Sequence, residues 1–366
     1  TDPTGETETG GLACEDKAPP GHEVETACFP VPDGLQSCEE CGPDCQQTNM
    51  NGAITQDPDF CWAEQLMVLC GPDDGVPQVP GSCCYTASYN GILCEGRPCI
   101  VDGAPRVASL VARADWSDPD IAPTVAGLDA TTRAALASAW REDGLMEHAS
   151  IAAFSRFVLQ LMAVAAPAWL VEETQRALDD EIEHARLCFG LGDAYGGDHQ
   201  GPGPLEVEDL LEETAEITDV AVATVVEGCV AETIAALLAR AALERARDPE
   251  VRRALARIAE DEARHATLAW RFVQWAIEEG GAPVREAVRA AFATTAARPP
   301  APRSLPADVD AAAMGDHGRL DAAAQIAVIE AGLAEVIGPC AAALVDPASR
   351  PARALEILPF PSGQVH

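Results

Sequence analysis

Two short segments of this chain carry the same pattern of acidic residues followed by a histidine. Residues 180–185 are D-E-I-E-H-A, and residues 261–266, 81 positions later, are D-E-A-R-H-A. Both segments lie in sequence rich in Ala, Leu, Glu and Arg, which favours helix. Residues three apart on a helix face the same way, so each segment presents one glutamate and one histidine together. Such pairs are metal ligands, and two of them predict two metal ions.

The repeat extends upstream of each segment. Glu142 and Glu147 match Glu227 and Glu232, with the same spacing inside each pair and the same offset of 85 between the pairs. Each half of the repeat therefore carries a Glu on one helix and Glu-x-x-His on the next, as expected for two copies of one helical hairpin. The six candidate ligands are Glu147, Glu181, His184, Glu232, Glu262 and His265.

These candidates fall on the apolar faces of their predicted helices. Glu147 lies four residues before Ile151, and Glu262 lies four residues after Ile258. Buried carboxylates are costly without a cation or another partner, and a close group of them would otherwise hold protons. Two divalent or trivalent ions would remove that cost. The alternative is a helical bundle with buried Glu–His and Glu–Arg networks, in which Arg264, Arg257 and Arg186 serve as partners.

Glu142 and Glu227 allow two interpretations. On an ideal α-helix an offset of five residues turns a side chain by about 140°, which predicts glutamates that are solvated or salt-bridged. A π-bulge near Gly144 and Gly228 would instead bring each of them onto the ligand face as a possible additional ligand. The same spacing in both halves of the repeat keeps this second interpretation open.

Four long alanine-rich helices are expected to position the ligands, over residues 130–165, 168–191, 206–246 and 249–280. The fourth has a clear start, with Asp248 as N-cap and Pro249 at the first helical position. The first and last connections are short, so the helices form two antiparallel hairpins. The Gly/Pro-rich residues 193–205 join the hairpins and can span about 40 Å when extended, enough to cross a bundle.

Residues 130–281 resemble the ferritin-like di-iron carboxylate superfamily, whose pattern is Glu, Glu-x-x-His, Glu, Glu-x-x-His on four helices. The resemblance implies a four-helix bundle that holds two iron ions. It also implies that Glu181 and Glu262 bridge the ions, while Glu147 and Glu232 are terminal ligands. Manganese suits the same carboxylate-rich ligand set.

The same resemblance implies supporting residues and sets limits. Asp180 and Asp261 occupy the positions from which an aspartate hydrogen-bonds a ligand histidine across the site. The chain lacks the paired C-x-x-C module of a rubrerythrin-like peroxidase. Cys188 stands four residues after the first motif histidine, where the small subunit of ribonucleotide reductase has its radical tyrosine. This difference argues against a tyrosyl radical.

Eleven of the 14 cysteines fall between Cys14 and Cys99, in a Gly/Pro-rich segment. This density indicates an irregular, disulfide-stabilised domain made in an oxidising compartment. The alternative is a metal site at Cys38, Cys41 and Cys45, although zinc ribbons need a second C-x-x-C pair and none is present. This cysteine usage leads us to expect an extracytoplasmic protein (periplasmic, cell-surface or secreted). Because the chain starts without Met, we expect that any targeting peptide has been removed or left out.

The 366 residues divide into four predicted segments. They are a cysteine-rich domain over 1–105, a connector over 106–129, a ferritin-like four-helix bundle over 130–281, and a helical extension with a tail over 282–366. The expected fold class is therefore mainly α, with a disulfide-rich irregular N-terminal domain and a C-terminal helical extension. We identify no chemistry in the extension.

The net charge and the predicted ligands limit the classes of function that this protein can have. A net charge of −35 argues against nucleic acid and anionic membranes as partners. The sequence has no run of about 18 apolar residues, so we expect no transmembrane helix. Two irons on four carboxylates and two histidines predict an oxidoreductase that activates O2 or H2O2. The alternative is a structural or interaction protein, in which metal stabilises the bundle and the cysteine-rich domain binds a partner or mediates oligomerisation. Iron sequestration is a third hypothesis.

Overall fold

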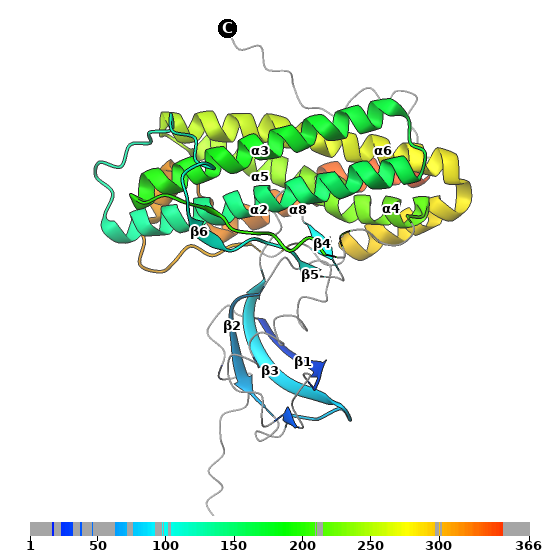
Figure 1. The fold of residues 1–366 in the computed structure, drawn as a ribbon, viewed down its shortest axis with the longest axis horizontal. Coiled ribbons are helices and arrows are strands. Elements are labelled where there is room, and N and C mark those ends of the chain that lie inside the picture. The colour runs from blue at the N-terminus through cyan, green and yellow to red at the C-terminus, as the bar shows by residue number, and fades with distance from the viewer. Residues whose placement is uncertain are drawn as a thin grey trace, which may run out of the picture. The chain divides into compact units, whose positions relative to one another are not determined.

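The structure is a computed structural model that describes residues 17, 23–31, 37–38, 46, 63–71, 76–91, 97, 99–101, 104–208, 210, 215–296, 300 and 302–346. The chain separates into two compact units. One comprises Thr1–Ile92 with Asp102–Ala104, and the other comprises Leu93–Val101 with Pro105–His366. The described residues are mainly helical, and the helices belong to the second unit (Figure 1).

The first unit contains a small antiparallel sheet. Its strands are β1 (Glu23–Pro30), β2 (Ala63–Cys70) and β3 (Ser82–Gly91), in the order β1-β3-β2. Between described residues of this unit, the disulfides are Cys28–Cys84 and Cys38–Cys83, and Cys28 lies directly opposite Cys84 in the β1–β3 pairing. The expectation of disulfides is confirmed, but the described part of this segment is a sheet rather than irregular chain.

The alternative metal site in the cysteine-rich segment loses one of its three ligands. Cys38 is bonded to Cys83, so its sulfur is not a free thiolate. Cys41 and Cys45 lie outside the described residues. The described part of this segment therefore supports disulfide chemistry.

Helices make up most of the described part of the second unit. In order, the elements are β4 (Ile100–Val101), β5 (Ala104–Pro105), β6 (Leu110–Ala112), α2 (Ala130–Ala163), α3 (Ala168–Gly196), β7 (Gln200–Pro202), α4 (Ile217–Thr224), the π-helix η4 (Val225–Val230), α5 (Ala231–Arg245), α6 (Pro249–Ala296), α7 (Ala311–Asp316), α8 (Ala322–Gly332), the π-helix η5 (Leu333–Ile337) and α9 (Gly338–Val345). The short strands β6 and β7 pair antiparallel.

Caps and packing fix the main helices. Asp129 caps α2 by accepting a hydrogen bond from the backbone N–H of Thr132. The predicted N-cap Asp248 accepts from two backbone N–H groups in the first turn of α6. Gly197, with φ of 82°, ends α3 in the left-handed conformation that favours glycine. Helix α2 packs along α3, α5 along α6, and α3 against α6 (Figure 1).

Three helix boundaries differ from the predicted ones. Helix α3 continues past residue 191 because Leu191 and Tyr195 are buried in the core. Helix α4 begins at Ile217, so the connection between the hairpins is longer than predicted and includes β7. The predicted helix 249–280 does not end there but continues as α6 into the C-terminal extension past a kink, where Gly281 has φ of 66°.

One apolar core serves the long helices and the C-terminal extension. The rings of Phe157 and Phe272 pack edge to face between α2 and α6, with centroids 5.0 Å apart. Met314, Leu320 and Ile329 of the extension join the same buried cluster. Packing of the extension on the long helices therefore makes it part of this core.

Two helical stretches, Ile217–Arg245 and Ala322–Val345, are long and apolar enough to cross a membrane by length and composition. This corrects the expectation that no such stretch exists, which counted uninterrupted apolar runs. Isolated glutamates break the runs without lowering the mean hydropathy much. The first window is 72% buried inside the protein, as in a core helix, and the second is 17% buried. Such stretches are weak support for a membrane protein.

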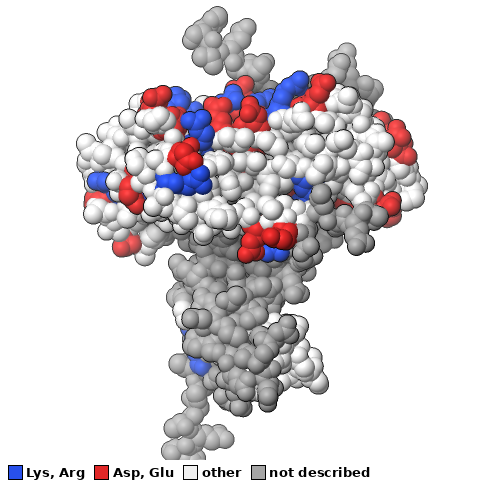
Figure 2. All heavy atoms as spheres, in the orientation of Figure 1, with Lys and Arg blue, Asp and Glu red and all other residues white. Residues whose placement is uncertain are grey.

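Acidic and basic side chains lie interspersed on the helical face that Figure 2 shows. Described ion pairs at the surface include Arg271 with Glu173 and Arg253 with Glu250. Exposed pairs of this kind contribute little to stability. They do engage the basic groups, so the visible helical face presents no continuous basic patch.

Candidate metal centre

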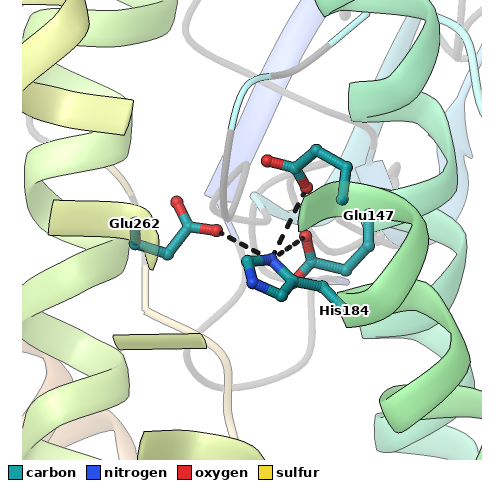
Figure 3. Close-up of side chains that lie close together, drawn as sticks. Glu147, His184 and Glu262 are labelled. Atoms are coloured by element: carbon teal, nitrogen blue, oxygen red, sulfur yellow. Dashed lines mark ion pairs between the residues drawn. The ribbon is translucent and has the colours of Figure 1, made fainter. Parts of the chain in front are cut away.

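Helices α2, α3, α5 and α6 bring the six candidate ligands into adjoining buried groups. The groups are Glu147, Glu181, His184 and Glu262, and Glu181, Glu232 and His265, with the ligand atoms of each group within 4.8 Å of one another. All six residues are buried. Glu181 belongs to both groups, whereas Glu262 belongs to the first group only. Glu147, His184 and Glu262 point toward one another from three different helices (Figure 3).

Most of the candidate ligand atoms have no hydrogen-bond partner among the described residues. These atoms are Glu147 Oε2, both carboxylate oxygens of Glu181, Glu232 and Glu262, and Nδ1 of His184 and His265. Each buried polar atom without a partner is costly, and a cation at the centre would satisfy all of these at once. Four carboxylates and two imidazoles fit iron or manganese. The residues present therefore suit a metal centre, whose identity they do not select.

Two aspartates orient the histidines toward the centre of the group. His184 Nε2 lies 3.1 Å from an oxygen of Asp261, and His265 Nε2 lies 3.3 Å from an oxygen of Asp180. A neutral imidazole that donates through Nε2 leaves the lone pair of Nδ1 free. That lone pair faces carboxylate oxygens, with His265 Nδ1 3.1 Å from Glu181 Oε1. Two acceptors at this distance are stabilised by a cation or by a proton between them.

Arg257 and Arg264 pair with the aspartates behind the histidines and not with the ligand glutamates. Arg264 Nη2 lies 2.8 Å from Asp180, and Arg257 Nε lies 2.8 Å from Asp261. Each arginine also pairs with the other aspartate. Among the described residues, the oxygens of the ligand glutamates without partners receive no arginine hydrogen bond. The ligand glutamates therefore do not show the Glu–Arg pairs of the alternative network, although their contacts with His184 and His265 are Glu–His contacts of the kind it predicts.

Crowding of the carboxylates shifts their titration. Burial, followed by the neighbouring glutamates, raises the pKa of Glu181 and Glu232 well above the ordinary value. Burial acts to lower the pKa of His184, but its acidic neighbours raise it well above the ordinary value. Burial also opposes ionisation of Glu262, yet contacts with His184 and Glu232 lower its pKa to about 2. Metal-free, the group therefore shares protons that a metal ion would displace.

Glu142 does not reach the candidate ligands. Helix α2 stays α-helical through Gly144, so the π-bulge interpretation is wrong in this half of the repeat. Gly144 packs against the ring of Phe189, and a Cβ there would lie 3.1 Å from the ring atoms. The Glu142 carboxylate lies at the exposed side of α2 and accepts a hydrogen bond from Ser138 Oγ at 2.7 Å.

The other half of the repeat has the π-helix η4, which contains Gly228. Glu227 is buried, but it lies with two arginines and outside the two ligand groups. Arg156 Nη2 is 2.7 Å and Arg97 Nε is 3.5 Å from its carboxylate oxygens. The predicted π-bulge is therefore present in the backbone of this half. The Glu227 carboxylate, however, pairs with arginines and not with the candidate ligands.

Sequence reasoning missed a second buried charge cluster one helical turn before Glu147. Asp143 accepts from Arg303 Nη1 and Arg319 Nη1, each at 2.5 Å, and these arginines come from the C-terminal extension. Both pairs hold the pKa of Asp143 below its ordinary value, against the effect of burial. The position of Asp143 four residues before Glu147 was the available signal in the sequence. The partners come from far along the chain, so periodicity could not identify them.

Comparisons of this chain with family models, with curated proteins and with solved structures found no match. The described residues define a mainly helical protein with a buried Glu/His group that could bind metal. The resemblance to the ferritin-like di-iron carboxylate superfamily therefore rests on the repeat in the sequence, with which this buried group is compatible.

Proposed function

We propose that residues 130–281 form a ferritin-like four-helix bundle holding two metal ions, with iron favoured over manganese. We further propose that the protein is an extracytoplasmic oxidoreductase acting with O2 or H2O2. One observation carries the proposal: oxygens of four glutamates and the Nδ1 atoms of two histidines converge, buried and without a hydrogen-bond partner among the described residues. The two disulfides support the oxidising location.

In this proposal the chain supplies six ligands that are held in place and shielded from bulk water. If two ions bind, Glu181 and Glu262 would be shared between them, Glu147 and Glu232 would each hold one ion, and each ion would take one histidine. When bound, two irons would supply the electrons that reduce O2 or peroxide. The aspartates behind the histidines keep both Nδ1 atoms directed inward. Burial of all six ligands excludes bulk water and favours a small oxidant.

A structural or interaction role is the alternative proposal. It is favoured by the separation of the chain into two units, of which the first has its own sheet and disulfides. In that case the metal stabilises the helices and the first unit binds a partner or a second copy. Iron sequestration, the third proposal, requires more metal per chain than six ligands can hold.

The test is metal content with an ultraviolet–visible spectrum on full-length protein made in an oxidising compartment. The protein is loaded with Fe(II) without oxygen and then exposed to O2 or H2O2. We expect about two irons per chain, with oxo-bridged ferric absorption after oxidation. Glu181→Ala/Glu262→Ala should lose both signals. Glu142→Ala is the matched control, because its carboxylate lies outside the ligand groups.

The outcomes separate the three proposals. Metal that does not react with either oxidant and only raises the melting temperature would support the structural role. Loading far above two irons per chain would support sequestration. Protein that binds neither iron nor manganese under these conditions would overturn the metal centre and move attention to the cysteine-rich unit.

A further inference from the structure

Arg97 lies buried beside the proposed metal centre without belonging to the predicted ligand set. Its side chain is 2% exposed. The guanidinium lies 4.0 Å from the ring centroid of Phe157 and 5.2 Å from that of Phe154. The Phe154 ring in turn packs edge to face against His265, with centroids 5.3 Å apart. Arg97 is therefore one aromatic side chain away from a proposed metal ligand.

Helix α2 also holds the main chain around Arg97. Ser150 Oγ donates a hydrogen bond of 2.9 Å to the carbonyl oxygen of Arg97. Arg156 Nη1 donates to the carbonyl oxygen of Ile100 in the same segment. Backbone bonds and ring contacts together fix where the guanidinium can lie. The Arg97 side chain is therefore held in place by the packing of the helical unit.

Glu227 is the carboxylate that this arginine faces. Arg156 Nη2 binds one oxygen of Glu227 at 2.7 Å, and Arg97 Nε lies 3.5 Å from the other. The three side chains are 2–10% exposed. Two buried guanidiniums on one buried carboxylate leave an excess positive charge on this side of the centre. Charges this deeply buried interact strongly because water screens them little.

The backbone of η4 puts Glu227 on the side of the proposed ligands. A π-helix closes hydrogen bonds from residue i to i+5, so residues five apart lie about one turn above each other. Glu227 is thus about one turn from Glu232, which is a proposed terminal ligand. Gly228 leaves room for this arrangement, since a Cβ there would lie 2.5 Å from the Cβ of Ala269 and 3.7 Å from Arg97 Nη1. Glu227 therefore precedes Glu232 by about one turn, and its carboxylate pairs with the two arginines.

We propose that Arg97 is a positioning residue that, together with Arg156, holds Glu227 out of the metal coordination and so keeps a coordination position open for a small oxidant. This inference rests on the proposed dinuclear centre. Without Arg97, one oxygen of Glu227 would be a buried, unpaired acceptor about one turn from Glu232. Arg156 would remain paired with the other oxygen of Glu227, and the freed oxygen would then turn to the metal. Glu227 would bind it and fill the open position.

The test uses full-length protein loaded with Co(II), whose visible absorption falls as its coordination number rises, and titrated with azide as a small anionic probe. Wild-type protein should bind azide with a change in the cobalt spectrum. Arg97→Met should show weaker cobalt absorption and an azide affinity lower by at least about tenfold. Arg97→Met/Glu227→Gln should regain both, because the amide no longer competes for the metal. This recovery separates a positioning role from a merely structural one.

Two results would overturn the inference while leaving the metal centre in place. One is unchanged azide affinity in Arg97→Met, and the other is a loss that Glu227→Gln does not restore. If Arg97→Met does not fold, Glu227→Gln alone decides. Its cobalt spectrum and azide affinity should match wild type, and a changed spectrum would mean that Glu227 is already a ligand. Failure of the wild-type protein to bind cobalt would overturn the proposed centre itself, and this inference with it.

Discussion

The two hairpins share one spacing of glutamates and surround it differently. In α2 the helix is regular, and Glu142 turns to the exposed side, where Ser138 is its partner. In the second hairpin η4 interrupts the helix, and Glu227 is buried against Arg97 and Arg156. The charge on Glu142 is compensated by solvent, while that on Glu227 requires the arginines. The repeat therefore sets the position of each glutamate in its helix, while the residues packed around the helix determine its burial and its partners.

Packing against the next helix distinguishes the hairpins as well. Gly228 is so close to α6 that a Cβ would lie 2.5 Å from the methyl carbon of Ala269. Gly144 faces the edge of a ring, Phe189, at 3.1 Å. A methyl group attached to a helix backbone cannot move aside, whereas a ring can rotate or shift slightly. The second hairpin is therefore more tightly constrained around its glutamate than the first.

The largest expected difference between the hairpins is in stability. Glu227→Ala leaves two buried guanidiniums without their carboxylate and should lower the free energy of unfolding by about 3–5 kcal/mol. Glu142→Ala removes an exposed group and should stay within about 0.5 kcal/mol of wild type. Urea unfolding of the metal-free proteins, followed by circular dichroism, measures both. Equal losses would mean that the two glutamates have equivalent surroundings.

A smaller difference is expected for the two aspartates that orient the histidines. The side chain of Asp261 is fully buried, while that of Asp180 is 12% exposed. Each asparagine variant should weaken metal binding, by about 10- to 100-fold for Asp261→Asn. The loss for Asp180→Asn should be smaller, because water can replace part of its interaction. Competition with a chelator for Co(II) gives both affinities. A larger loss at Asp180 would reverse this order of importance.

The glycines test the packing difference directly. Gly228→Ala should lower the free energy of unfolding by about 1–2 kcal/mol, because η4 and α6 must separate to admit one methyl group. Gly144→Ala gains helix propensity of up to about 1 kcal/mol, which offsets the displacement of the Phe189 ring. Thermal unfolding of the two variants compares them. A Gly144→Ala variant that is less stable than Gly228→Ala would show that the ring is the more rigid neighbour.

The features that the sequence could predict are those that depend on residues close together in the chain. Period and composition predicted the long helices, and the cap at Asp248 followed from Asp-Pro. The Glu-x-x-His repeat identified the residues that the structure gathers into buried groups. Helical spacing sets those positions before any tertiary contact forms. The ligand roles themselves stay a prediction, since only the gathering of the side chains is observed.

The parts that sequence could not predict depend on contacts between distant segments. Arg97 lies in a segment without periodicity, and only the folded chain brings it to Glu227. Arg303 and Arg319 reach Asp143 from the extension in the same way. One glycine in each half suggested a π-bulge in both, but the bulge forms only where close packing and buried arginines accompany it. The many turn residues also concealed the three strands of the first unit.

The matched glutamates Glu181 and Glu262 provide the last expected difference, which is one of pH dependence. In metal-free protein the pKa of Glu181 is raised well above the ordinary value of 4.5, and that of Glu262 is lowered to about 2. Folding therefore makes Glu181 take up a proton, and its contribution to stability falls as pH rises above 4.5 through the raised pKa. The contribution of Glu262 is present above 4.5 and is lost as pH falls toward about 2.

Glutamine variants of metal-free protein separate these slopes, each of which is at most about 1.4 kcal/mol per pH unit. Glu181→Gln should flatten the loss of stability above pH 4.5, and Glu262→Gln should flatten the loss below it. Calorimetry across this range gives the slopes, with Glu142→Gln as the exposed control. Metal should reverse the first slope, because bound ions require Glu181 to be ionised and acid then removes them. If both variants flatten the same side, the two carboxyl groups share one proton and the hairpins do not differ in how they hold charge.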